Sequence, residues 1–126
     1  MDKAKGTVLV VDDEQTLLEL ATDLLTSFGY DIITARNGEQ ALDIYGSRHE
    51  TIDVILMDMC MPGIDGAECL DRILQMDPGA KVIMSTGYSS DGWGRKMVER
   101  GAAGFLDKPF HIADVIRKIE ELLQTR

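Results

Sequence analysis

The chain has 126 residues, 44% of them hydrophobic and 28% charged, which is the length and composition of one soluble globular domain. Its formal net charge of −9 disfavours binding to nucleic acids and to anionic membranes, which attract basic surfaces. No apolar run is long enough to span a bilayer, and the N-terminus lacks a signal peptide's apolar segment. Two cysteines, Cys60 and Cys69, fit free thiols in a reducing compartment, so we expect a cytoplasmic protein.

Short β-rich runs and helical apolar patterns alternate along the whole chain. In chain order, the predicted elements are strand 7–11, helix 17–28, strand 31–35, helix 39–45, strand 53–57, helix 67–74, strand 81–85, helix 93–100, strand 103–106 and helix 112–123. Strands that alternate with helices in this way predict a parallel sheet covered by helices on both faces. Because the sequence contains neither a linker nor an internal repeat, we expect one α/β domain over residues 1–126.

Acidic side chains follow two of the predicted strands. Asp12 and Asp13 come directly after the first strand, and Asp58 comes directly after the third. Ligands of open parallel sheets bind at the carboxyl ends of the strands, so adjacent first and third strands would bring these carboxylates together. Two carboxylates about 4 Å apart repel by roughly 4 kcal/mol at an effective dielectric of 20, which favours a bound cation, and Mg²⁺ is the best candidate. For Asp12 alone, capping of the following helix is an equally good explanation.

Four motifs occur in a fixed order: VLVVDDE, ILMDMCMPGIDG, STG and GFLDKPF. Together they resemble the receiver domain of two-component response regulators, and the resemblance covers essentially the whole chain. It implies a doubly wound, flavodoxin-like (βα)5 fold with the strand order 2-1-3-4-5. It also implies phosphorelay signalling, in which a histidine kinase or a histidine phosphotransfer protein donates the phosphoryl group.

The resemblance also implies roles for the acidic residues and their neighbour. Asp58 would be the phosphoacceptor, a carboxylate nucleophile that forms an acyl phosphate. Asp13 would bind Mg²⁺ directly, and Asp12 would act more through water. The backbone carbonyl of Cys60 would supply a further metal ligand.

Four residues near the ends of the fourth and fifth strands complete the implied site. Lys108 would approach the phosphoryl oxygens as a compact cation, and the bond between Lys108 and Pro109 is expected to be cis. Thr86 would turn toward the phosphoryl group, and Phe105 would turn inward with it. This movement would reshape the face formed by the fourth helix, the fifth strand and the fifth helix. A threonine that ends a strand and a phenylalanine in GFL are also common in ordinary cores.

Two other functional classes share features with this sequence. A phosphatase of the haloacid dehalogenase type also uses an aspartate nucleophile and Mg²⁺, but it usually has a second aspartate where this chain has Cys60. A flavodoxin-like electron carrier needs a phosphate-binding loop after the first strand, where VDDEQT is acidic. We therefore expect a signalling domain that catalyses only its own phosphorylation and dephosphorylation. It would be a stand-alone regulator or a receiver from a hybrid sensor kinase.

Overall fold

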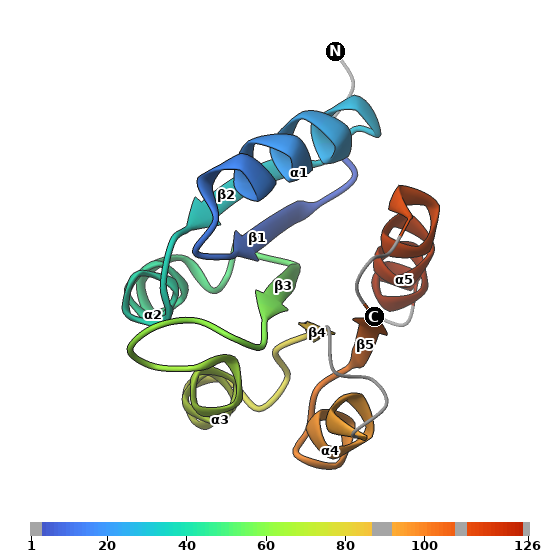
Figure 1. The fold of residues 1–126 in the computed structure, drawn as a ribbon. Helices are drawn as coiled ribbons and strands as arrows, with labels where there is room; N and C mark the ends of the chain where they lie inside the picture. Colours follow the sequence, from blue (N-terminus) through green and yellow to red (C-terminus); the bar gives the residue numbers. More distant parts are fainter. Residues whose placement is uncertain (1–3, 87–91, 108–110, 125–126) are drawn as a thin grey trace.

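The computed structural model describes residues 4–86, 92–107 and 111–124, and Figure 1 shows its fold. Strands and helices alternate along the chain. The strands are β1 (Thr7–Val11), β2 (Asp31–Ala35), β3 (Val54–Asp58), β4 (Val82–Thr86) and β5 (Gly104–Asp107). The helices are α1 (Gln15–Ser27), α2 (Gly38–Arg48), α3 (Gly66–Met76), α4 (Trp93–Glu99) and α5 (Ile112–Gln124).

The strands form one parallel sheet in the order β2-β1-β3-β4-β5, which confirms the order implied by the receiver resemblance. β3 and β4 lie at inner positions, and every residue of both strands is buried. The edge strand β2 has two exposed residues, Asp31 and Thr34. The chain leaves β1 toward one edge and β3 toward the other, so the carboxyl ends of these two strands form the switch point where ligands of such sheets bind.

Helices cover both faces of the sheet, as predicted (Figure 1). Successive side chains of a strand point to opposite faces. Val10 and Leu56 belong to the apolar cluster that packs against α1 and α5. Leu9 and Met84 belong to the opposite cluster, which packs against α2, α3 and α4. The strand residues therefore read as continuous apolar runs because both of their faces are buried.

The element bounds depart from the sequence prediction mainly at the helix ends. The strands begin and end within one residue of their predicted positions, whereas α2 extends to Arg48. The residues of α2 beyond Tyr45 are Gly46, Ser47 and Arg48, and none of them is an apolar residue that periodicity would detect. At the helix starts, the side chain of Asn37 accepts a hydrogen bond from the backbone N–H of Gln40 at 2.8 Å, which fixes the first turn of α2. None of the helices in the described part of the chain is long and apolar enough to cross a membrane.

Candidate functional site

Three carboxylates meet at the carboxyl ends of β1 and β3. Val11 of β1 pairs with Met57 of β3, so the next residues lie side by side: Asp12 directly after β1, and Asp58 as the last residue of β3. One carboxylate oxygen from each of Asp12, Asp13 and Asp58 lies within 4.8 Å of the other two. Asp12 and Asp58 are buried and Asp13 is exposed. The structure therefore brings together the three acidic residues that the sequence predicted to converge.

The backbone at the start of α1 holds Asp12 in place. Its Oδ1 atom accepts a hydrogen bond from the backbone N–H of Glu14 at 3.0 Å. Glu14, rather than Asp12, is the N-cap residue of α1. Asp12 therefore does not occupy the N-cap position of α1. Its carboxylate does orient the turn that leads into the helix.

Asp12 and Asp58, but not Asp13, line a pocket of about 460 Å³. Asp12, Asp58 and Ser85 line its polar end, and the pocket continues between α1 and α5 along apolar side chains that include Leu24 and Ile112. Asp58 therefore borders a cavity although it is 7% exposed.

The segment after Asp58 is fixed between β4 and the start of α3. The backbone N–H of Met59 donates to the carbonyl of Ser85 at 3.0 Å, and the N–H of Gly66 donates to the carbonyl of Met59 at 3.0 Å. A Cβ atom at Gly66 would lie 2.4 Å from the carbonyl oxygen of Asp58, so only glycine fits here. Gly66 was not among the predicted site residues, and the available signal was the glycine that ends the PGIDG turn.

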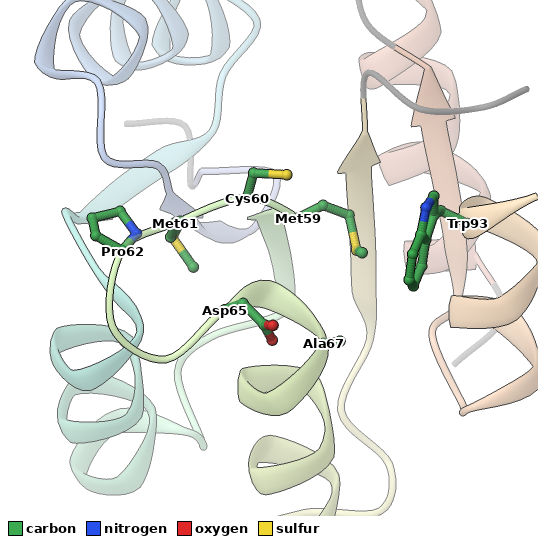
Figure 2. Close-up of a pocket in the computed structure, with 7 residues that line it drawn as sticks. All are labelled: Met59, Cys60, Met61, Pro62, Asp65, Ala67 and Trp93. Atoms are coloured by element: carbon green, nitrogen blue, oxygen red, sulfur yellow. The ribbon is translucent and has the colours of Figure 1, made fainter. Parts of the chain in front are cut away.

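The loop 59–62 also lines a second pocket, of about 680 Å³, together with Asp65, Ala67 and Trp93. Figure 2 shows Met59 extending from this loop toward Trp93, while the side chains of Cys60 and Met61 leave the loop in opposite directions. The Cys60 thiol is exposed. The role of the Cys60 carbonyl as a metal ligand stays a prediction.

The two expected switch residues lie on β4, which pairs with β3, and on β5, which pairs with β4. Asp58 pairs with Ser85 of β4, and the next residue of β4, Thr86, is 1% exposed and pairs with Asp107 of β5. Phe105 of β5 is partly buried and packs against the core cluster that α4 covers. Lys108 and Pro109 lie outside the described residues, so their roles and the expected cis bond stay predictions.

The sequence model of the response regulator receiver domain matches residues 8–120 of this chain. The chain belongs to this family. Receiver domains are signalling domains of phosphorelays, not classical enzymes, and these matches give no support to a haloacid dehalogenase-type phosphatase. The acidic cluster of the chain lies where the receiver fold places its ligand site, at the carboxyl ends of β1 and β3.

Proteins from several bacteria resemble this chain over nearly its whole length. Sporulation initiation phosphotransferase F of Bacillus subtilis is 34% identical over 116 residues, which cover 92% of this chain and 92% of that protein. A cyclic di-GMP phosphodiesterase of Thermotoga maritima is 33% identical over 120 residues. The match covers 95% of this chain but only 32% of the length of that protein. A chain in the CheX–CheY–BeF3–Mg²⁺ complex of Borrelia burgdorferi is 32% identical with a TM-score of 0.89, and the match covers 94% of this receiver and 90% of that chain.

The two cysteines of this receiver should differ in reactivity. Burial raises the pKa of the Cys69 thiol to about 12, and the thiol lies 3.8 Å from the carbonyl oxygen of Gly38. Because the thiolate is the reactive form, the buried Cys69 should not react at pH 8 while the exposed Cys60 does. A chromogenic disulfide reagent should therefore titrate one thiol in the native protein and two in denaturant. Cys60→Ser should remove the native signal, and two reactive thiols in the native protein would contradict the burial of Cys69.

Proposed function

We propose that this receiver accepts a phosphoryl group on Asp58 from a phosphohistidine of a histidine kinase or histidine phosphotransfer protein. The observation that carries the proposal is the cluster of Asp12, Asp13 and Asp58 at the switch point of the sheet. Asp58 is the member of this cluster that ends the central strand β3 and lines the pocket. We further propose that residues 1–126 act as one receiver domain and that the protein works in the cytoplasm.

The donor set fits Mg²⁺. Three carboxylates within 4.8 Å of one another offer hard oxygen ligands, and the exposed Asp13 leaves one side of the cluster open to water. We assign metal binding to Asp12, Asp13 and Asp58, with the backbone carbonyl of Cys60 as a further ligand. When bound, Mg²⁺ would offset the negative charge of the phosphoryl oxygens.

The chain itself supplies the nucleophile and holds it in place. A carboxylate oxygen of Asp58 attacks phosphorus, the bond from phosphorus to the histidine nitrogen breaks, and the histidine takes up a proton. Hydrolysis later returns the Asp58 carboxylate and inorganic phosphate. Positioning matters most in such transfers, and the backbone bonds of Met59 to Ser85 and of Gly66 to Met59 fix the segment that follows Asp58.

The response to phosphorylation would pass through Thr86 and Phe105. Thr86 is buried at the end of β4, the strand that pairs with β3, and Phe105 lies on β5 beneath α4. In the proposed switch, Thr86 turns toward the phosphoryl oxygens and Phe105 moves inward, so the face of α4, β5 and α5 changes shape. We assign to Lys108 the cationic contact with the phosphoryl group.

Incubation with acetyl phosphate tests the proposed function. In the presence of Mg²⁺ the protein should gain the mass of one phosphoryl group, and hydroxylamine should remove it because an acyl phosphate is labile to this nucleophile. Excess chelator should prevent labelling. Asp13→Ala should need at least about tenfold more Mg²⁺ for half-maximal labelling, because it loses one charged ligand. Labelling that resists hydroxylamine, or that is independent of Mg²⁺ in the wild type, would contradict the proposal.

A further inference from the structure

The ring of Phe105 packs against helix α4 at Gly94. Gly94 is the second residue of α4 and is buried, and α4 lies beside β5 (Figure 1). A Cβ atom at Gly94 would lie 2.3 Å from Cδ2, 2.5 Å from Cγ and 2.6 Å from Cε2 of Phe105. These separations are far shorter than a van der Waals contact, so a side chain at position 94 and the ring cannot both occupy their present places.

The backbone of Gly94 does not itself require glycine. Gly92, the N-cap of α4, has a φ of 74°, which favours glycine, whereas Gly94 is not among the described glycines with positive φ. Glycine inside a helix lowers stability relative to alanine because it has more conformational freedom to lose on folding. The close approach of the Phe105 ring is therefore the feature that explains glycine at this position.

The other end of α4 is bonded to α3. The Nε atom of Arg100, the residue after α4, donates to Oδ1 of Asp71 at 3.2 Å, and its guanidinium also bonds to the second carboxylate oxygen. A further bond runs from Arg100 to the carbonyl of Ala67 at 3.4 Å. These bonds link the C-terminal end of α4 to α3, whereas Gly94 and Trp93 lie in the first turn of α4, at its other end.

We propose that Gly94 leaves the space that the Phe105 ring occupies. As a positioning residue, Gly94 would thereby set the equilibrium between the two arrangements of the switch. The inference rests on the proposed function, in which phosphorylation of Asp58 moves Phe105 inward. In the seated arrangement, the Phe105 ring packs against Gly94. In the alternative arrangement, the ring has moved inward. A methyl group at position 94 penalises only the seated arrangement, so it raises the population of the alternative before any phosphoryl group is bound.

The test is a titration with beryllofluoride in the presence of Mg²⁺. Calorimetry and the fluorescence emission of Trp93, the single tryptophan, measure the binding. Trp93 precedes Gly94 and faces the pocket that Met59 lines (Figure 2). Gly94→Ala should bind beryllofluoride at least about threefold more tightly than the wild type, because the apparent affinity scales with the competent fraction. The matched control is Gly46→Ala in α2, where a Cβ would lie 3.8 Å from Sδ of Met76, and it should leave the affinity unchanged.

The ring must be the cause of the effect, so Gly94→Ala should not tighten binding when Phe105 is also replaced by alanine. Unchanged or weaker binding by folded Gly94→Ala would overturn the inference, as would equal tightening in the Phe105→Ala background. If Gly94→Ala does not fold, the double variant with Phe105→Ala tests the inference. The inference requires the double variant to be as stable as Phe105→Ala alone, because the overlapping ring is gone. A double variant that stays unfolded would overturn it. A wild type that is not labelled on Asp58 would refute the proposed function instead.

Discussion

Asn in place of Asp58 should abolish labelling by acetyl phosphate. The amide keeps the shape of the side chain but has no carboxylate oxygen that can attack phosphorus. Asp58 is 7% exposed and lies within 4.8 Å of the carboxylates of Asp12 and Asp13, so the substitution also removes one of three crowded negative charges. We therefore expect the free energy of unfolding, measured in urea, to stay the same or rise while the mass increase is lost.

Asp65→Asn is the matched control for this experiment. Asp65 lies at the end of the loop that follows Asp58, is exposed, and accepts a hydrogen bond from the backbone N–H of Glu68 at 2.9 Å as the N-cap of α3. Asparagine is an equally good N-cap residue, so this variant should keep both its stability and its labelling. Full labelling of Asp58→Asn would show that the phosphoryl group is carried elsewhere, and the assignment of the phosphoacceptor would be wrong.

The strands and the sheet were predictable because burial acts on whole runs of residues. The inner strands β3 and β4 are buried along their whole lengths, so the apolar run of each in the sequence has nearly the same limits as the strand. The helix ends were less predictable because local hydrogen bonds decide them. The side chain of Asn37 starts α2 one residue before the predicted position, and the polar last turn reaches Arg48.

The acidic cluster was predictable for a topological reason, whereas the glycines that shape its surroundings were not. Once β1 and β3 are neighbours, residues that follow them must lie side by side, which places Asp12 next to Asp58. Gly66 and Gly94 matter because an atom from another part of the chain lies 2.4 Å and 2.3 Å, respectively, from the position that a Cβ atom would occupy. Such distances depend on how helices pack on the finished sheet, and neither periodicity nor composition contains them.

Gly66→Ala should therefore damage both the fold and the site. The added Cβ would lie 2.4 Å from the carbonyl oxygen of Asp58 and 2.8 Å from the Cα of Met59. Both atoms belong to the backbone, so no side-chain rotation relieves the overlap and the start of α3 must move away from β3. We expect the free energy of unfolding to fall by about 3 kcal/mol, the upper end of the usual cost of overpacking. Urea denaturation followed by circular dichroism measures this loss.

The same movement should slow phosphorylation in the molecules that remain folded. The bond from the N–H of Gly66 to the carbonyl of Met59 would be strained or lost, and with it a contact that fixes the residue next to Asp58. Because small displacements of a nucleophile reduce rates strongly, labelling by acetyl phosphate should be at least about tenfold slower. Gly46→Ala is the control for the substitution itself, and it should gain about 0.5–1 kcal/mol because its Cβ meets no backbone atom in the described structure. Wild-type stability in Gly66→Ala would mean that α3 and the end of β3 are less closely packed than these distances require. The fixed position of Asp58 would then have to come from the strand alone.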